Sequence, residues 1–534
     1  MRCSLASSIA VTCATVLALP VSLAAPAAAA VPSALGLPPA ATAQPPAPEL
    51  PGATQSLPLE PLDTGDRSLG GGADDADVQG LTRRDVRPFS LVGVVWDDPA
   101  AALHGVVQVR TRATGGGAWS EWQDVETHNE EHGADPDTAE GHGRALKGST
   151  APLWVGDSDG VEIRVRGDEP LPEGLRLELV DPGEAPGGTP AQDPAQEPET
   201  TATPATAATA ATAVTEATAA AEATAATAVT KASWSRTTAG SLALAGLSAA
   251  QAAVSGVNTQ LAPFGSAWIP ALSKEATELT LPFAPAPGEA QAPQAAPHVL
   301  PDEAQAPDEA QAAEAQAPAE AQASEQLAAA KPYIGPRPKI ITRAGWGADE
   351  RIREKGFVYT KTIKAAFVHH SATGNNYTCA QAPSVLRSIY RYHVQSSGWR
   401  DFGYNFAVDK CGNIYEGRAG GVAKPVLGAH TLGFNTNSMG IAVLGTFTKS
   451  NPPAAVVTAV ARLTAWKLGL HGVNPKGSAY LVSGGGNLYK KGSTVKLNAI
   501  AGHRDGFATE CPGARLYGKL GTARTSSAKY QGRS

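Results

Sequence analysis

Two histidines and one cysteine near the C-terminal end of the chain have residue types suited to a metal site. One of the adjacent pair His369 and His370 ends the apolar stretch AAFVHH, and His503 follows a second apolar stretch in NAIAGHRD. Cys511 comes eight residues after His503, in TECPG. Two imidazoles and one thiolate satisfy three corners of a tetrahedral zinc site and leave the fourth for water. Such a site suits hydrolysis, because the metal lowers the pKa of its bound water to about 7 and polarises a carbonyl.

The adjacent histidines need two separate explanations, because neighbouring side chains on a β-strand point to opposite faces. Only one of His369 and His370 can therefore look into a site from that strand. Any long chain offers two histidines and a cysteine, so the spacing alone is a weak signal. A thiol hydrolase that uses Cys511 with His503 is an alternative that the same residues allow.

The chain contains five cysteines, and two of them lie in a predicted secretory signal over residues 1–30. This stretch has Arg2 near its start, then an apolar run and an Ala-rich end, as signal peptides do. We therefore expect a secreted protein, extracellular or associated with the cell wall, with no membrane span after cleavage. If the metal protects Cys511 from pairing, then Cys379 and Cys411 are the expected disulfide in an oxidising compartment.

Charge divides the chain into an acidic part and a basic part. The 534 residues carry 43 Lys and Arg against 50 Asp and Glu, a net charge of −7. Residues 331–534 hold 28 basic and 8 acidic side chains, a net charge of +20, which leaves −27 for the remainder. A basic secreted module suggests an anionic partner such as a cell wall or a nucleic acid. The basic residues are scattered and form no aromatic-basic recognition motif, which disfavours nucleic acid.

Composition divides the part of the chain between the signal and this basic module into three segments. Residues 31–84 are rich in Ala, Pro, Gly and Asp and are predicted to be a disordered leader. Residues 85–182 alternate apolar and polar side chains in VVQVRTR, VEIRVR and LRLELV, which predicts a small all-β domain. Residues 183–330 contain an Ala/Thr tract and EAQAP-like repeats, which predict a long disordered linker. An apolar island at 242–283 is expected to form at most a transient helix pair.

Residues 331–534 have the mixture of apolar and polar residues that is typical of a globular domain. The strand AAFVHH is followed by a helix over 382–395 and by GYNFAVD and NIYEGR, which read as a hairpin. The strand MGIAVLGTF, a helix over 453–470, a strand at NAIAGHRD and a short helix after Pro512 complete the order. This mixture predicts an α/β layered domain.

Six motifs, taken in their order, give this module a family resemblance. They are RAGWGAD, FVHHSAT, WRDFGYNFAVDKCGNIYEGR, GAH, NSMGIAVLGTF and GHRD with TECPG. Over roughly 190 residues, the size of one domain, they closely resemble the zinc amidases of the peptidoglycan recognition protein and phage lysozyme-type N-acetylmuramoyl-L-alanine amidase family. The resemblance implies a mixed β-sheet flanked by helices, with zinc at one end of a groove.

The resemblance also implies roles for individual residues. The positions that match the family's zinc ligands are His369, His503 and Cys511. His370, on the opposite face of the strand, is then expected to be a buried structural residue. Tyr404 matches the family's catalytic tyrosine, whose phenol can stabilise a developing oxyanion, and Thr509 stands where some members carry lysine as a second donor. The positions that resemble substrate contacts in the groove are His393, Trp399 and His430.

The implied reaction is hydrolysis, by zinc-activated water, of the amide between N-acetylmuramic acid and L-alanine of the peptidoglycan stem peptide. Peptidoglycan is then the expected partner and Zn²⁺ the expected cofactor. The alternative is a non-catalytic peptidoglycan-binding recognition protein, because family members that lose a zinc ligand still bind. All three ligand positions and Tyr404 are present in this sequence, which favours the enzyme.

Overall fold

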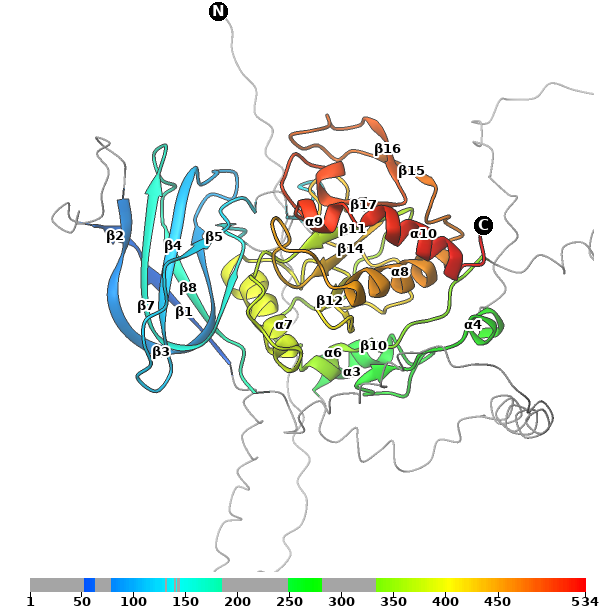
Figure 1. Cartoon of the computed structure of the whole chain (residues 1–534), viewed down its shortest axis with the longest axis horizontal. Helices are drawn as coiled ribbons and strands as arrows, with labels where there is room; N and C mark the ends of the chain where they lie inside the picture. The colour runs from blue at the N-terminus through cyan, green and yellow to red at the C-terminus, as the bar shows by residue number, and fades with distance from the viewer. Residues whose placement is uncertain are drawn as a thin grey trace, which may run out of the picture. The chain divides into compact units, whose positions relative to one another are not determined.

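The structure is a computed structural model that describes residues 52–62, 78–129, 132–138, 141, 145–184, 248–280 and 333–534 (Figure 1). The described residues, from 52 to 534, all belong to one compact unit. The predicted signal at 1–30 and most of the predicted leader and linker lie outside the described residues. Among the helices that are described, none is long and apolar enough to cross a membrane.

The N-terminal module is an antiparallel β-structure, as the alternating sequence predicts. Its strands follow the order β1-β8-β3-β7-β4-β5, and the short strands β2 and β6 pair with β3. In β4, Val107, Val109 and Thr111 are buried whereas the residues between them are less so, because alternate side chains face the core. The strands are β1 (Ala53–Pro58), β2 (Glu60–Pro61), β3 (Val78–Trp96), β4 (Gly105–Ala113), β5 (Gln123–Val125), β6 (Gly148–Ser149), β7 (Leu153–Gly167) and β8 (Arg176–Asp181).

Part of this sheet lies in the range 31–84, which the sequence predicted to be a disordered leader. β1 pairs with β8, and the first residues of β3 pair with β7. Leu59 and Leu81 are buried in the core of the module, so the prediction is wrong for 52–62 and 78–84. Single leucines in a stretch rich in Pro and Gly give no periodic signal, but distant strands provide the surface against which they pack.

The C-terminal module is built around a seven-stranded mixed sheet in the order β17-β11-β14-β12-β13-β10-β9. β11 pairs in parallel with β14 and β17, whereas β12 and β13 form the predicted antiparallel hairpin. All six residues of β11 are buried, as expected for a strand covered on both faces. The strands are β9 (Trp268–Ile269), β10 (Ile340–Ile341), β11 (Ala365–His370), β12 (Phe406–Val408), β13 (Ile414–Glu416), β14 (Ser438–Val443) and β17 (Ile500–Gly502).

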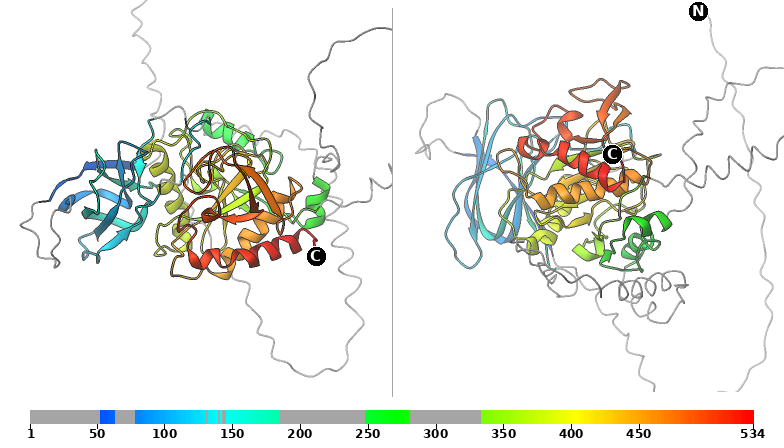
Figure 2. Two further views of the ribbon diagram at one scale, coloured as in Figure 1. Left: turned by 90° about the horizontal axis from the view of Figure 1, so that it is seen from above. Right: turned by 45° about the vertical axis from the view of Figure 1, so that its right-hand side comes forward.

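Helices cover both faces of this sheet (Figures 1 and 2). Val368 and Ile441 share a core cluster with residues of α8 and α10, whereas Ala407 and Ala442 share another with α7. The predicted α/β layers are therefore confirmed, although the hairpin β15–β16 and helix α10 were not foreseen. These elements are α6 (Arg343–Trp346), α7 (Ala382–Arg391), a π-helical turn η3 (Tyr392–Ser396), α8 (Ala454–Gly469), β15 (Ser478–Val482), β16 (Thr494–Asn498), a 3₁₀ turn η4 (His503–Asp505), α9 (Ala514–Tyr517) and α10 (Leu520–Tyr530).

Residues 248–280 belong to the C-terminal module, although the sequence placed them in a disordered linker over 183–330. They form α3 (Ala249–Gly256), β9 and α4 (Lys274–Thr280), and β9 pairs with β10 at the edge of the sheet. Asn258 donates from Nδ2 to Glu416 at 2.9 Å and accepts from the amide of Val422 at 3.1 Å. The linker prediction is wrong for this stretch, because its apolar residues pack against a sheet built from distant parts of the chain, which local sequence does not reveal.

The predicted disulfide between Cys379 and Cys411 is present. It joins the turn before α7 to the tight turn of the β12–β13 hairpin. Cys511 lies outside this bridge and is buried.

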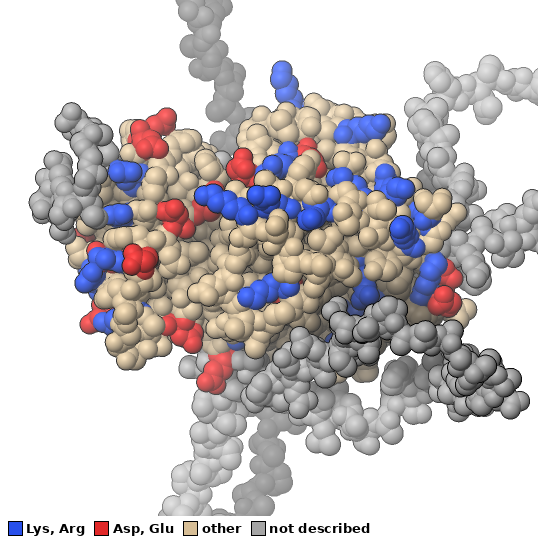
Figure 3. All heavy atoms as spheres, viewed as in Figure 1, with Lys and Arg blue, Asp and Glu red and all other residues tan. Residues whose placement is uncertain are grey.

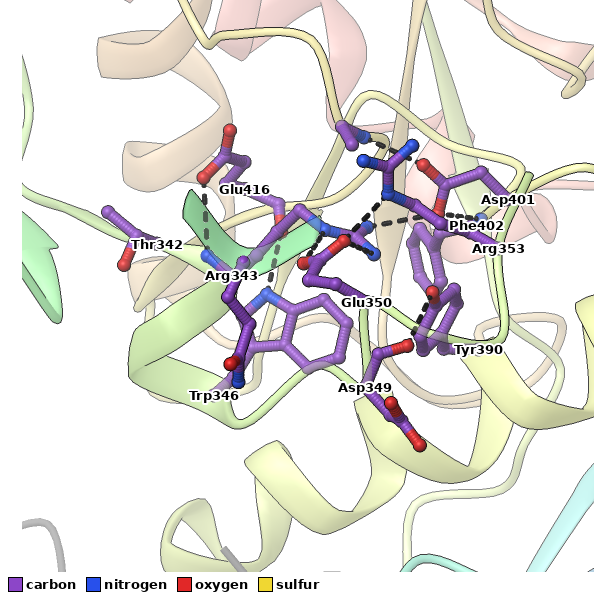
Figure 4. A network of polar contacts seen from close by, with 12 residues as sticks. Thr342, Arg343, Trp346, Asp349, Glu350, Arg353, Tyr390, Asp401, Phe402 and Glu416 are labelled. Carbon is purple, nitrogen blue, oxygen red and sulfur yellow. Dashed lines mark hydrogen bonds and ion pairs between the residues drawn. The ribbon is translucent and has the colours of Figure 1, made fainter. Parts of the chain in front are cut away.

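A buried ionic network fixes α6 against the loop that leads to β12 (Figure 4). The guanidinium of Arg343 is fully buried and pairs with Glu350 at 2.6 Å and with Asp401 at 3.1 Å. Glu350 also accepts from Arg353 at 2.7 Å. The indole of Trp346 donates to the carbonyl of Glu416 at 2.7 Å, so the RAGW segment is tied to the hairpin as well.

Replacing Arg343 should destabilise the protein strongly. The change Arg343→Met leaves Glu350 and Asp401 as buried charges with a partner removed, which costs about 3–5 kcal/mol in comparable sites. The free energy of unfolding from urea denaturation measures this loss. Arg351→Met is the matched control, because its ion pair with Asp349 has an arginine side chain 45% exposed and should contribute at most about 1 kcal/mol. Equal losses in the two variants would contradict the assignment.

Candidate metal centre and the cleft beside it

The parallel pairing of β11 with β17 brings two of the predicted ligands together. Val368 lies opposite Gly502 in this register, so His369 and His503 each come one residue later at the same end of the sheet. Both side chains are fully buried, and their rings lie 4.5 Å apart between centroids. His503 begins the turn η4, and the carboxylate of Asp505 fixes this turn by accepting from the amide of Gly502 at 2.9 Å.

The third predicted ligand reaches the same place because its loop folds back on itself. The amide of Arg504 donates to the carbonyl of Cys511 at 3.0 Å. The Sγ atom of Cys511 then lies 3.8 Å from Nδ1 of His369. The other ring nitrogen of His369, Nε2, lies 3.4 Å from the hydroxyl of Thr431. A contact between one ring nitrogen and a neighbouring hydroxyl orients a ligating imidazole and leaves the other nitrogen, here Nδ1, directed at the site.

A fourth potential ligand, His132, comes from the N-terminal module. One donor atom from each of His132, His369, His503 and Cys511 can be chosen so that all four lie within 4.8 Å of one another. The ring of His132 lies 4.5 Å from that of His503 and 5.4 Å from that of His369, between centroids. The sequence analysis missed His132, because its surroundings lack any strand or helix periodicity. The available signal was compositional, since three of the 11 histidines fall within residues 128–142.

The donor set fits a zinc ion. The group offers three imidazoles and one thiolate. Both are usual ligand types for zinc in proteins, with Zn–N near 2.0–2.1 Å and Zn–S near 2.3 Å. Tetrahedral angles at those bond lengths separate the nitrogen and sulfur atoms by about 3.5 Å, close to the 3.8 Å between His369 and Cys511. Burial lowers the pKa of His132 to about 3 and holds the pKa of His369 well below its ordinary value. Both imidazoles are therefore neutral, the form that binds a metal.

The two histidines of the opening pair have different surroundings. His369 shares its face of β11 with Ala365 and Phe367, which pack in a cluster apart from Val368 on the other face. His370 is not one of the four donors; it lines the cavity beside them, and its Nδ1 accepts from the amide of Phe447 at 3.4 Å. Burial lowers the pKa of His370 to about 4. Of the two adjacent histidines, the structure thus places only His369 among the four donors, as the alternation of side chains along the strand requires.

A cavity of about 430 Å³ opens beside the donor group. Tyr404, Thr509 and Cys511 line it on the side of the C-terminal module. Tyr404 is buried, and its ring centroid lies 5.2 Å from that of His369. The hydroxyl of Thr509 accepts from the amide of Cys511 at 3.1 Å. The N-terminal module supplies another part of the wall, formed by Glu126, His128, Asn129, His132, Ala151 and Pro152.

The predicted substrate contacts divide into one cavity residue and two packing residues. His393, in the π-helical turn η3, lines the cavity and stacks on Trp399 with ring centroids 4.3 Å apart. Trp399 and His430 are not among the described residues that line this cavity. His430 lies behind His369, with centroids 5.3 Å apart, and its Nδ1 lies 3.0 Å from the hydroxyl of Thr431. In this structure Trp399 and His430 therefore support residues of the site.

Comparison with known proteins agrees with this division into modules. A family described as "Rv3811 N-terminal galactose-binding domain-like" matches residues 39–205, and one described as "N-acetylmuramoyl-L-alanine amidase" matches residues 359–514. The N-terminal module is thus an all-β domain of a galactose-binding-like type. The C-terminal module is a domain of the amidase class.

Curated relatives match the same C-terminal third of the chain. Peptidoglycan-recognition protein SC1a of Drosophila melanogaster is 30% identical over 192 residues, which are 35% of this chain and 87% of the relative. Peptidoglycan-recognition protein SC2 of Drosophila simulans is 28% identical over 34% of this chain and 85% of its own length. The human N-acetylmuramoyl-L-alanine amidase is 30% identical over 35% of this chain and 28% of its own length.

The chain belongs to the family of peptidoglycan-recognition proteins and N-acetylmuramoyl-L-alanine amidases, and the resemblance seen in the motifs is confirmed. Among solved structures, Drosophila PGRP-LB aligns with 34% of this chain and 92% of its own at 26% identity, with a TM-score of 0.27.

Separate substitution of the two adjacent histidines tests which of them is a metal ligand. His369→Gln should weaken zinc binding by more than about 100-fold, beyond the 10–100-fold loss typical of outer-shell partners. His370→Gln keeps a side chain of similar size and a hydrogen-bond acceptor, and it should retain the affinity of the parent chain. Competition with a chromophoric chelator measures both dissociation constants. Retained affinity in His369→Gln, or an equal loss in His370→Gln, would exclude this arrangement.

Proposed function

We propose that the C-terminal module is a zinc-dependent N-acetylmuramoyl-L-alanine amidase of a secreted protein. Its substrate is the amide between N-acetylmuramic acid and L-alanine of the peptidoglycan stem peptide. The observation that carries this proposal is the convergence of His369, His503 and Cys511 beside a cavity lined by Tyr404. The family contains proteins named as peptidoglycan-recognition proteins and amidases, which supports the substrate class.

His369, His503 and Cys511 are the residues that would hold the zinc ion. When bound there, zinc polarises the scissile carbonyl and lowers the pKa of a water molecule. In the hydrolysis, water oxygen bonds to the carbonyl carbon of the lactyl group, and the C–N bond to L-alanine breaks. The amine then leaves with a proton from solvent. Each turnover gives one new carboxylate on the lactyl group of N-acetylmuramic acid and one new amino group on the L-alanine of the stem peptide.

Tyr404 and Thr509 are the polar groups placed to assist at the cavity. The phenol of Tyr404 can donate to the carbonyl oxygen as negative charge develops on it, because its ring lies beside His369. Thr509 offers only a neutral hydroxyl, so it provides less stabilisation of that charge than a lysine at this position would. His393 has the position of a substrate contact, and the stacked ring of Trp399 holds its orientation.

Charge and redox chemistry are consistent with action on a cell wall. Lys and Arg are spread over the face of the C-terminal module drawn in Figure 3, and Asp and Glu are fewer there. A module with a net charge of +20 over 331–534 is attracted to anionic wall polymers. The disulfide Cys379–Cys411 suits an oxidising compartment, which supports secretion.

Chelation should separate this proposal from its rivals. The full chain, incubated with purified cell walls, should release new L-alanine amino groups, lose this activity with a chelator and regain it with Zn²⁺. A thiol hydrolase using Cys511 would instead be insensitive to the chelator and inactivated by alkylation. A protein that only binds peptidoglycan would sediment with the walls and release no amino groups. Labelling of the amino groups followed by amino-acid analysis distinguishes the three.

Removing one hydroxyl group tests the role of Tyr404. Tyr404→Phe should lower the rate of amide hydrolysis by about 10²–10³-fold, the usual loss when one oxyanion donor is removed, with little change in metal content. Tyr480→Phe is the matched control, because Tyr480 is 57% exposed on β15 and is not among the described residues that line the cavity. A rate in Tyr404→Phe equal to that of the control would remove Tyr404 from the reaction.

A further inference from the structure

The N-terminal module reaches the metal centre through one short segment. The His132 segment, residues 126–129 and 132–138, places its histidine beside the three donors of the C-terminal module. The side chain of His132 is 8% exposed, and its ring also lies 6.0 Å from that of Tyr404, between centroids. It therefore lies near both the other three donors and the residue proposed to assist the reaction.

The number of donors changes the chemistry of the site. With three protein ligands, a zinc site keeps one position for water or substrate, as catalytic sites do. With four protein ligands it is closed, as structural zinc sites are. His132 brings the set to three nitrogens and one sulfur, all within 4.8 Å of one another.

Hydrogen bonds hold the His132 segment against the C-terminal module. The carboxylate of Asp135 is buried and accepts from the amide of Gly433 at 2.5 Å and from Nδ2 of Asn435 at 3.1 Å. The same Nδ2 donates to the carbonyl of Gly133 at 2.8 Å. Gly433 and Asn435 belong to the loop that precedes β14, so the segment is fastened next to the metal centre through Gly133 and Asp135, which follow His132 in the chain.

A packed interface between the modules supports this segment. Leu91, Trp154 and Val180 of the N-terminal sheet share a core cluster with residues of α7. The hydroxyl of Tyr392 lies 3.1 Å from the carbonyl of Val94 and 3.0 Å from that of Thr150, and can donate to either. The carboxylate of Glu178 accepts from Ser396 at 2.8 Å. Buried apolar and polar contacts of this kind give the His132 segment a rigid support.

We propose that His132 is a fourth protein ligand of the metal and that the N-terminal module thereby keeps the amidase in a latent, closed state. The proposal rests on the proposed function, because it assumes that the other three donors hold zinc. Displacement of the His132 segment opens one coordination position and also removes one wall of the cavity, formed by Glu126, His128 and Asn129. Metal coordination and substrate access are therefore controlled by the same movement.

Cobalt spectroscopy of the full chain tests the coordination directly. The visible absorption of bound Co²⁺ depends on its ligands, and azide is a small probe that binds where a position is open or held by water. The spectrum of the parent chain should not respond to azide. The spectrum of His132→Ala should differ from it and respond to azide with saturation. His104→Ala removes an exposed histidine of the same module, outside the metal group and the cavity lining, and should behave as the parent.

A second variant protects the test against misfolding of His132→Ala. Asp135→Ala removes the contacts to Gly433 and Asn435 without changing a donor, so the Co²⁺ spectrum should also become responsive to azide. A parent spectrum that responds to azide as strongly as both variants would overturn the proposal. So would a spectrum that stays unresponsive in both variants while circular dichroism shows them folded.

Activity separates this proposal from the proposed function. His132→Ala should release L-alanine amino groups from cell walls about tenfold faster or more than the parent, because its open state is no longer a minor population. If the azide response appears but neither chain cleaves, the amidase assignment fails and the coordination by His132 stands. If both chains cleave at the same rate and respond equally to azide, the amidase assignment stands and the coordination by His132 fails.

Discussion

The parallel pairing of β11 with β17 is the constraint on which the metal centre depends. It places two strands that are separated by more than a hundred positions in the chain side by side, so that His369 of β11 and His503, directly after β17, lie at the same end of the sheet. The loop after β17 then returns Cys511 to that edge through a backbone hydrogen bond from Arg504. Side-chain chemistry completes the arrangement, because Thr431 and Asp505 fix the orientation of His369 and of the turn that carries His503.

The N-terminal module contributes His132 to this centre. The packing of the two modules therefore bears on the chemistry of the site. A β-sheet domain that only binds a ligand could be joined to the C-terminal module by a linker, without packing against it. Here its apolar face packs on α7, and Val94 and Glu178 accept hydrogen bonds from Tyr392 and Ser396 in the turn η3 that follows this helix. The segment that carries His132 extends from this docked sheet. Packing of one domain thus determines the coordination chemistry available to the other.

Sequence reasoning predicted the parts of the structure that depend on local pattern. The alternation in VVQVRTR predicted β4, the apolar run AAFVHH predicted β11, and the ordered motifs predicted the ligands that the sheet brings together. It failed where long-range packing decides. Leu59, Leu81 and the residues of β9 lie in stretches of low-complexity appearance, and they are ordered by surfaces formed elsewhere in the chain. His132 was missed for the same reason, since a ligand on an irregular segment of a separate module leaves no periodic signal.

The edge strand β9 has a consequence for how the chain can be divided. It comes from a segment far upstream of its partner β10, and Ile269 and Ile340 are both fully buried where the two strands meet. A fragment trimmed to begin at residue 331 would retain each predicted ligand, yet it would leave the backbone of β10 without its neighbour. Unprotected sheet edges recruit strands from other molecules. Aggregation of such a fragment would then result from the loss of β9. A fragment designed to fold as this module therefore has to include residues 248–280.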